Sequence, residues 1–346
     1  MKFQNLVLEQ IAYEIPNEIF SSERIETELS DLYEKCKLPH GRLELMTGIK
    51  ARRHWPAGTK PSNIAAQAAK NLFTKSKIDP QSIDLLIHAS VCRDFLEPAT
   101  ASVVHEHLKL SPHCQIFDLS NACLGMLNAV LVAGAMIESG QIKRALIVSG
   151  ENGGPLLEQT LKTLKNDPSI DRKSIKKYFA NLTIGSAGVA MTLCHKDLCP
   201  QGISILGGEV ATDSEASHLC RGDGNPDSLI MQTDSEELLK AGIKLTGLNW
   251  ERTKTELSWT NESVDWVIGH QVGEAHERLV LENLGLRQKK THITYDEFGN
   301  TGSAAWALTL ARLLENKNQP QKGERMAIVG IGSGLSCVML GMLWNT

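Results

Sequence analysis

The chain has 346 residues, of which 42% are hydrophobic and 22% charged, and its formal net charge is -4. This is the balance of an ordinary globular protein, and the length exceeds the roughly 250–300 residues at which one core stops growing, so two domains or pseudo-domains are expected. Lysine and arginine form no long run and no stretch reaches the ~18 apolar residues of a membrane span, which excludes a nucleic-acid-binding face and a transmembrane segment. The N-terminal residues lack the features of a signal peptide, so a cytoplasmic location is expected.

The cysteines and histidines do not suggest a disulfide framework or a metal site. Eight cysteines are scattered along the chain without any CxxC pair. His105, His107, His113 and Cys114 stand close together, but their irregular spacing is more typical of a helix end and loop than of a zinc site. No metal and no other cofactor is therefore expected.

Near the N-terminus, "TGIKARRHW" places two arginines beside each other, Arg52 and Arg53. A guanidinium group suits a phosphate, so these side chains are candidates for binding the phosphates of coenzyme A or an acidic carrier protein. Ordinary surface arginines are an equally good interpretation of this segment.

Four continuous apolar runs predict strands that are covered on both faces. They are "LLIHAS" from residue 85, "ALIVSG" from 145, "WVIGH" from 266 and "AIVGIG" from 327. Two helices are predicted between them from apolar residues at three- and four-residue steps, one after Cys123 and one after the small residues "NTGSAA". Strand and helix alternate, which predicts a layered α/β sandwich.

The strands and helices repeat as a unit. "IDLLIHASV" resembles "VDWVIGHQV", and "RALIVSGENGG" resembles "RMAIVGIGSGL"; Ile87 and Ile147 are 60 positions apart, and Val267 and Ile328 are 61 apart. One supersecondary unit has been used twice, which predicts two pseudo-symmetric halves, residues 1–195 and 196–346. Residues 153–180 have no counterpart and are predicted to form an inserted helical flap, and residues 211–236 a surface excursion.

"DLSNACLGMLNAV" places Cys123 where a strand turns into a helix. A free cysteine is most often a packed core residue, but a helix N-terminus lowers the pKa of a thiol and favours the nucleophilic thiolate. His270 ends a second-half strand, and Asn300 stands at the second-half corner that matches the corner of Cys123. If the halves pack face to face, these three residues converge.

Such a trio suits acyl transfer. A histidine can accept the thiol proton or hydrogen-bond a reacting carbonyl, and an asparagine N–H can stabilise an oxyanion without a permanent charge. The glycine-rich "GIGSGL" from residue 330 can bring backbone N–H groups close. It lacks the lysine of a nucleotide-binding loop.

"DLSNACLG", "VIGHQVGEAH", "FGNTGSAA" and "GIGSGLSC" together resemble the signature regions of the thiolase superfamily, in its ketoacyl synthase III branch. The resemblance covers nearly the whole chain and implies a duplicated βαβαβαββ fold in α-β-α-β-α layers. It implies that Cys123 accepts an acyl group, that His270 and Asn300 hold the thioester carbonyl of a second substrate, and that the backbone N–H groups of Cys123 and Ser333 form an oxyanion hole.

"ASVCRDFLEPATAS" is similar to a region of the head-to-head acyl-CoA condensing enzymes of this superfamily. That resemblance implies that Glu97 reaches across a homodimer interface as the base that removes an α-proton. Glutamate before proline is also ordinary loop sequence. The "LGM" after Cys123 and "HQVG" from His270 differ from the pattern of the synthases that initiate fatty-acid synthesis.

The function expected from this resemblance is an acyltransferase that performs a Claisen condensation of two acyl thioesters through an acyl-cysteine to a β-keto product. Two long-chain acyl-CoAs are the expected substrates. Coenzyme A enters as part of the substrate and not as a cofactor, and an acyl-carrier protein is the other thioester donor considered. The alternatives are a decarboxylating synthase that uses malonyl-carrier protein, acyl transfer to an amine or hydroxyl, and an idle assembly subunit.

Overall fold

The computed structural model describes residues 1–222 and 231–345, and its centre is one ten-stranded mixed sheet. The strands run in the order β12-β11-β13-β14-β8-β1-β7-β6-β4-β5. The first five strands of the sheet in sequence are β1 (Leu6–Glu14), β4 (Leu85–His88), β5 (Gln115–Asp118), β6 (Arg144–Glu151) and β7 (Ala187–His195). The later five are β8 (Ile203–Thr212), β11 (Trp266–Gly269), β12 (Lys290–Thr291), β13 (Arg325–Gly332) and β14 (Ser336–Leu343).

The two groups of five strands are paired in the same way. In the first, β4 is parallel to β5 and β6, and β6 and β1 are antiparallel to β7. In the second, β11 is parallel to β12 and β13, and β13 and β8 are antiparallel to β14. Antiparallel pairing of β1 with β8 joins the groups. The expected domain boundary at residue 195 falls between β7 and β8, and we keep that division as a proposal.

Equivalent hydrogen bonds show how closely the two groups correspond. The backbone N–H of Asp84, just before β4, donates to the carbonyl of Arg144 at 3.0 Å, and that of Asp265, just before β11, donates to the carbonyl of Arg325 at 2.9 Å. The Asp84 carboxylate accepts from the Arg144 N–H, and the Asp265 carboxylate accepts from the Arg325 N–H. An acidic residue before each apolar run therefore sets the register of the same pair of parallel strands in both halves.

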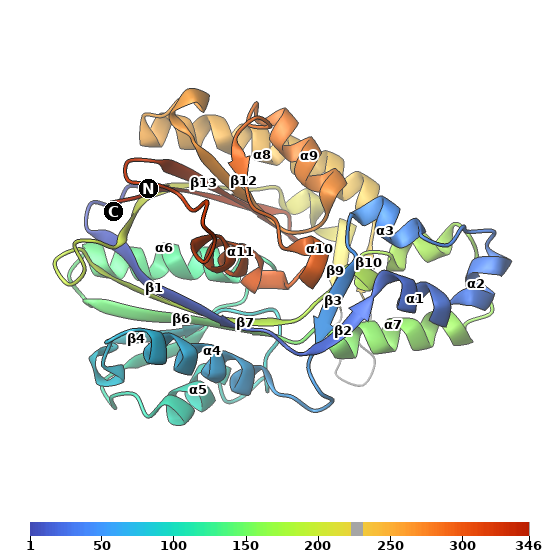
Figure 1. Ribbon diagram of the computed structural model, residues 1–346, viewed down its shortest axis with the longest axis horizontal. Coiled ribbons are helices and arrows are strands. Elements are labelled where there is room, and N and C mark those ends of the chain that lie inside the picture. The colour runs from blue at the N-terminus through green and yellow to red at the C-terminus, as the bar shows by residue number, and fades with distance from the viewer. Residues whose placement is uncertain (223–230, 346) are drawn as a thin grey trace.

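Helices divide the structure into five layers (Figure 1). Outside the first group of strands lie α4 (Pro61–Lys75) and α5 (Thr100–Leu108), and outside the second lie α8 (Ser235–Leu257) and α9 (Glu274–Asn283). Between the two groups run α6 (Gly125–Glu138) and α11 (Ala305–Leu314). The predicted α-β-α-β-α sandwich is confirmed.

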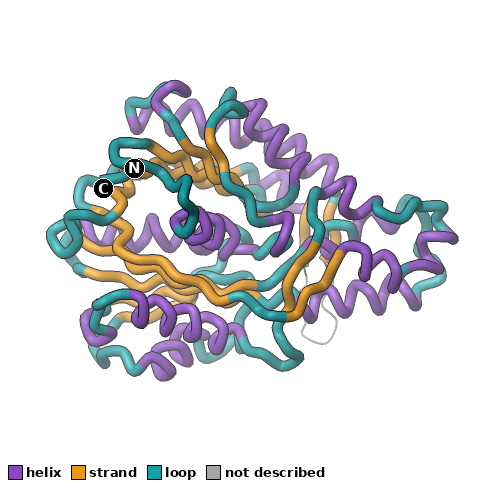
Figure 2. The backbone as a smooth tube through the Cα atoms, in the orientation of Figure 1, coloured by secondary structure: helices purple, strands orange, loops and turns teal. Residues whose placement is uncertain are grey.

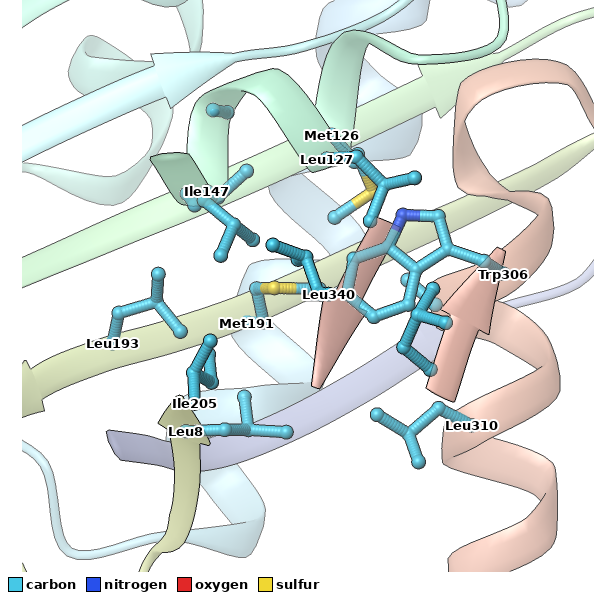
Figure 3. Packing of buried hydrophobic residues seen from close by; sticks show 14 of the residues in the cluster. Leu8, Met126, Leu127, Ile147, Met191, Leu193, Ile205, Trp306, Leu310 and Leu340 are labelled. Atoms are coloured by element: carbon cyan, nitrogen blue, oxygen red, sulfur yellow. The ribbon is translucent and has the colours of Figure 1, made fainter. Parts of the chain in front are cut away.

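The largest core surrounds the two inner helices, because both of their flanks face strands. In Figure 3, Met126 and Leu127 from α6 and Trp306 from α11 lie in one cluster with Met191 of β7 and Leu340 of β14. Burial of apolar surface contributes roughly 25 cal/mol per Å², so this shared core stabilises both halves at once. It also fixes the N-terminal ends of α6 and α11 with respect to each other.

A lobe of helices projects from one end of the sandwich, at the right of Figures 1 and 2. It consists of α1 (Ser22–Glu28), α2 (Ser30–Lys35), α3 (Arg42–Thr47) and α7 (Gly154–Asn166), and the two-stranded sheet of β2 (Glu18–Ser21) and β3 (Ala51–His54) lies at its base. Leu157, Leu161 and Leu164 of α7 are buried against α1–α3. The expected flap is therefore a helix whose leucine stripe is covered by N-terminal helices.

The remaining elements are short. α10 (Tyr295–Phe298) precedes the corner at residues 299–304, and the 3-10 helix η4 (Ser214–Leu219) leads into the hairpin of β9 (Cys220–Gly222) and β10 (Met231–Thr233). The predicted excursion at 211–236 includes the end of β8 and this hairpin; its residues 223–230 lie outside the described part. Among the helices that the structure describes, none is both long and apolar enough to cross a bilayer.

Candidate active site

Cys123 stands in a tight corner between β5 and α6. The Leu124 N–H donates to the carbonyl of Asn121 at 2.9 Å, and Ala122 adopts a left-handed conformation with φ of 46°. A residue with a Cβ seldom adopts that conformation, and such strained positions cluster at functional sites. The sharp turn leaves Cys123 partly exposed just before the first turn of α6.

The protonation state of Cys123 differs from the prediction. Burial, together with the carboxylate of Glu151 and the nearby thiol of Cys220, raises the pKa of the Cys123 thiol to about 12. The expectation of a pKa lowered by the helix is wrong for the free site, because loss of water and a nearby anion both disfavour the thiolate. Cys123 is therefore a neutral thiol at rest, and its proton must be removed when it reacts.

The turn between β13 and β14 lies against this corner. A Cβ added at Gly332 would lie 3.5 Å from the backbone nitrogen of Cys123 and 3.1 Å from Cγ of Leu124. Ser333 follows Gly332 and is partly exposed. Glycine thus permits the backbone before Ser333 to approach the Cys123 N–H, which is the proximity that an oxyanion hole formed by these two residues needs. That role stays a prediction.

His270 follows β11, next to the strand that contacts α6. Its backbone N–H donates to the carbonyl of Val329 at 3.0 Å, and β13 continues to Gly330, where an added Cβ would meet the side chain of Leu127. Burial, with a smaller effect of His276, lowers the pKa of His270 to about 3. The imidazole is neutral at physiological pH and can accept one proton and donate another.

Asn300 is buried at the corner after α10. Its backbone N–H donates to the carbonyl of Thr183, and its backbone carbonyl accepts from the N–H of Gly185, both at 2.9 Å. The side-chain Oδ1 accepts a hydrogen bond from the N–H of Gly302 at 3.0 Å. With its oxygen occupied, the amide presents Nδ2 as the end that can donate to a substrate oxygen.

Ser303 connects the corner of Asn300 to the helix behind Cys123. Its hydroxyl donates to the carbonyl of Ala89 at 2.8 Å and accepts from the N–H of Met126, in the first turn of α6, at 2.8 Å. The fold therefore brings the Asn300 corner and the N-terminal end of α6 together through one buried hydroxyl group.

Glu97 lies on an exposed loop and contributes nothing to this network. Its neighbours Phe95 and Leu96 are 43% and 90% exposed, and Val91 at the start of the loop is 48% exposed. Glu97 itself is exposed. Apolar side chains gathered on one loop suit a surface that a second subunit covers, but the role of Glu97 as a base stays a prediction.

The two arginines lie in different surroundings. Arg52 is fully buried and donates to the carbonyl of Phe20 and the hydroxyl of Ser22. Burial lowers the pKa of Arg52 to about 10. A phosphate cannot reach this side chain in the described conformation, which corrects the expectation for Arg52. Arg53 is partly exposed, with its guanidinium 5.8 Å from the ring centre of Phe298, and remains a candidate.

Glu151, the last residue of β6, is a further candidate that no sequence motif singled out. It is 3% exposed, and its carboxylate accepts hydrogen bonds from the N–H groups of Val91, Cys92 and Ser303. Burial raises its pKa. The signal in the sequence was its position: in the internal repeat, the strand end that carries Glu151 corresponds to the one that carries Gly332.

The described residues 1–222 and 231–345 contain no group of three or more histidine, cysteine, aspartate or glutamate side chains arranged to hold a metal ion. His105, which the sequence places near two other histidines, has its Nε2 2.9 Å from the carbonyl oxygen of Ser111.

Comparison with known proteins identifies the family. Residues 117–165, which include Cys123, match the model of 3-oxoacyl-[acyl-carrier-protein] synthase III, and residues 255–344, which include His270 and Asn300, match the model of its C-terminal part. The two matched segments therefore contain the corners of Cys123, His270 and Asn300 described above.

Full-length relatives divide into two levels of similarity. The chain is 35% identical to the acyl-CoA:acyl-CoA alkyltransferase of Xanthomonas campestris over 99% of this chain and all of the relative, and 34% identical to that of Shewanella oneidensis over the same shares. It is 26% identical to the beta-ketoacyl-[acyl-carrier-protein] synthase III of Neisseria gonorrhoeae over 88% of this chain and 91% of the relative.

Solved structures of OleA share the fold of this chain over its full length. The crystal structure of Xanthomonas campestris OleA with bound cerulenin superposes with a TM-score of 0.94 at 34% identity, over 99% of this chain and 98% of that one. An OleA structure with lauric acid and lauroyl-CoA bound superposes with a TM-score of 0.93. The resemblance seen in the sequence motifs is confirmed. The chain therefore belongs to the 3-oxoacyl-[acyl-carrier-protein] synthase III family, and within it is an acyltransferase similar over its full length to the acyl-CoA:acyl-CoA alkyltransferases.

Proposed function

We propose that this protein is an acyl-CoA:acyl-CoA alkyltransferase, which joins two acyl-CoA molecules in a Claisen condensation and releases a β-keto thioester. The full-length similarity to two alkyltransferases, at 35% and 34% identity, carries this proposal, because the carrier-protein synthase relative is 26% identical. The neutral thiol, neutral imidazole and oriented amide described above are groups that this reaction can use.

In the first half-reaction, the sulfur of Cys123 attacks the carbonyl of one acyl-CoA. The thiol must lose its proton, and the neutral imidazole of His270 is suited to accept it and pass it to the departing sulfur of coenzyme A. A new carbon–sulfur bond forms on Cys123 as the bond to coenzyme A breaks. The N–H groups of Cys123 and Ser333 stabilise the oxyanion that develops.

In the second half-reaction, the partner subunit's Glu97 removes a proton from the α-carbon of the second acyl-CoA. Hydrogen bonds from neutral His270 and from Nδ2 of Asn300 stabilise the enolate oxygen. The α-carbon then attacks the acyl-cysteine: a carbon–carbon bond forms and the bond to the Cys123 sulfur breaks. The thiolate takes up a proton from solvent as protonated Glu97 returns to solvent the proton that it removed. The product keeps the coenzyme A of the second substrate.

A homodimer follows from this assignment, because Glu97 lies on the exposed loop and acts on a neighbouring subunit. The exposed Val91, Phe95 and Leu96 supply the apolar surface that such an interface would bury. Arg53 is the arginine that remains available for a phosphate of coenzyme A.

The test combines intact-mass analysis with product analysis. Incubation with acyl-CoAs of several chain lengths should load Cys123 with one acyl group, and mass spectrometry should find a β-keto product from acyl-CoA alone. In Cys123→Ser both signals should fall at least about 10³-fold, whereas the matched control Cys199→Ser, a partly exposed cysteine elsewhere, should keep them.

Two results would contradict the proposal. Condensation that requires a malonyl thioester and releases CO2 would identify a decarboxylating synthase instead. A thiol that is never acylated by any acyl-CoA or acyl-carrier protein would leave the protein as an idle subunit.

A further inference from the structure

Hydrogen bonds attach the loop that carries Glu97 to the sandwich at both of its ends. The N–H groups of Val91 and Cys92 donate to the carboxylate of Glu151 at 2.9 and 3.3 Å. Two residues later, the carboxylate of Asp94 accepts from the N–H and the hydroxyl of Ser62 at 2.9 and 2.5 Å. After the loop, the N–H groups of Thr100 and Ala101 donate to the carboxylate of Asp118 at 2.7 and 2.8 Å. The side chains between these attachments are exposed, so the position of the tip depends on Glu151 together with Asp94 and Asp118.

Glu151 also holds the corner that carries Asn300. Its Oε1 accepts from the N–H of Ser303 at 3.1 Å, and a Cβ added at Gly302 would lie 3.2 Å from the same oxygen. Gly302 is the residue whose N–H orients the amide of Asn300. One oxygen of Glu151 therefore contacts both the Glu97 loop, through Val91, and the Asn300 corner.

The charge of Glu151 has no compensating cation among the residues the structure describes, since none of their ion pairs includes it. A buried carboxylate is costly unless hydrogen bonds satisfy it, and three backbone N–H groups do so here. Its negative charge is also felt at Cys123, whose pKa it helps to raise. A residue kept only for packing would not need a carboxylate at this place.

We propose that Glu151 is a positioning residue for the condensation step: its carboxylate fixes, in one geometry, the loop that presents Glu97 to the partner subunit and the corner that presents Asn300. This inference rests on the proposed function. It predicts that Glu151 acts on the second half-reaction more than on the first, because both residues it positions belong to the second.

Two substitutions separate the effect of the charge of Glu151 from the effect of its side-chain length. Glu151→Gln keeps the length but replaces one oxygen by an NH2 group, which at the Oε2 position faces the N–H of Cys92 and removes that attachment. Glu151→Asp keeps the charge but withdraws the carboxylate by one methylene group. Both should lower the condensation rate by about 10²-fold, the loss typical of a misplacement of about 1 Å, and both should leave the rate of Cys123 acylation within about threefold.

The titration of Cys123 gives a readout that a merely structural role would not change. Alkylation of Cys123 by iodoacetamide, followed by peptide mass spectrometry across pH, should shift to lower pH in Glu151→Gln, because the anion that disfavours the thiolate is gone. In Glu151→Asp the curve should stay near that of the wild type. If Glu151→Gln does not fold, Glu151→Asp and its half-reaction rates carry the test.

Glu26 provides the matched control. It is a buried carboxylate that accepts hydrogen bonds from the N–H of Leu43 and the hydroxyl of Tyr33, but it lies in the helical lobe. Glu26→Gln should lower thermal stability without changing the ratio of the two half-reactions or the titration of Cys123.

The outcomes are distinguishable. Equal losses of acylation and condensation in the Glu151 variants, or a condensation rate within about twofold of the wild type, would overturn the positioning role while the proposed function stands. A wild-type protein that acylates Cys123 but never forms a β-keto product would overturn both.

Discussion

The two halves of the molecule use the same backbone to place different chemistry. After β4, the N–H of Ala89 donates to the carbonyl of Val148 at 2.7 Å; after β11, the N–H of His270 donates to the carbonyl of Val329 at 3.0 Å. The first position has a methyl side chain, and the second has an imidazole. Strand pairing therefore fixes the location of the site, while single residues at the strand ends decide what each half contributes.

The ends of β6 and β13 differ in the same manner. Both strands have eight residues, and their last residues are Glu151 and Gly332. Glu151 fills its position with a carboxylate that holds three N–H groups, whereas Gly332 leaves its position empty so that the corner of Cys123 can approach. Neither residue could replace the other, because a side chain at 332 would meet Leu124 and a glycine at 151 would leave the N–H groups of Val91, Cys92 and Ser303 without their acceptor.

Among the substitutions that test this comparison of the two halves, the largest change in rate is expected at the corner of Asn300. Asn300→Ala removes a donor to the enolate oxygen and should lower the condensation rate by about 10²–10³-fold, the loss typical of one oxyanion donor. Acylation of Cys123, in which Asn300 has no assigned role, should fall far less. Single-turnover rates of acyl-cysteine formation and of β-keto product formation measure the two effects separately.

Asn71→Ala is the control for this substitution, since Asn71 donates to the carbonyl of Tyr13 on the outer surface and does not contact the site. It should leave both rates unchanged. If Asn300→Ala lowers acylation and condensation by the same factor, the assignment of Asn300 to the condensation step is wrong.

Much of the fold could be predicted from the sequence because it is repeated. The acidic residue before each apolar run, Asp84 and Asp265, is the one that sets strand register in the structure. Cys123 and Asn300 were found because they stand at matching corners of the repeat, and His270 because it ends a second-half strand. Repetition made these positions visible without any knowledge of the side chains around them.

What the sequence could not reveal depends on burial and on contacts between distant segments. The helix after Cys123 predicts a lowered pKa, but only the structure shows the surrounding burial and the carboxylate of Glu151, which raise it. Arg52 looked like a surface arginine and is buried. The leucines of the predicted flap pack against the N-terminal helices, whose proximity no local pattern predicts.

A smaller effect is expected on stability, where each half has one buried histidine near the end of its first parallel strand. Burial lowers the pKa of His88, in the first half, to about 4 and that of His270, in the second, to about 3. Because an unfolded histidine titrates near 6.5, the unfolded state binds more protons as pH falls below that value, and the free energy of unfolding decreases. Between pH 7.5 and 5, each histidine should account for a loss of about 2 kcal/mol, about 30-fold in the unfolding equilibrium.

Urea unfolding at pH 7.5 and 5.0 measures this loss. The loss in free energy of unfolding between these pH values should be about 2 kcal/mol smaller in His88→Gln than in the wild type. In His113→Gln the loss should equal that of the wild type, since His113 is exposed. If the free energy of unfolding decreases equally in the wild type and in His88→Gln, His88 does not control stability in acid. The two halves would then differ in how their buried histidines respond to pH.

The smallest effect is expected at Gly332, where the comparison between strand ends is most direct. Gly332→Ala places a Cβ 3.1 Å from Cγ of Leu124, and Leu124 is fully buried. The side chain of Leu124 must therefore shift slightly, which moves the N–H of the adjacent Cys123. Acylation should fall about tenfold, because the backbone donors of the oxyanion hole separate, while Gly154→Ala, whose nearest neighbouring atom would be 3.4 Å away, should have no effect. Stopped-flow acylation with a chromogenic acyl thioester measures both variants. An unchanged rate in Gly332→Ala would mean that the turn after β13 needs no close approach to Cys123, and that glycine at this strand end serves the packing of α6 alone.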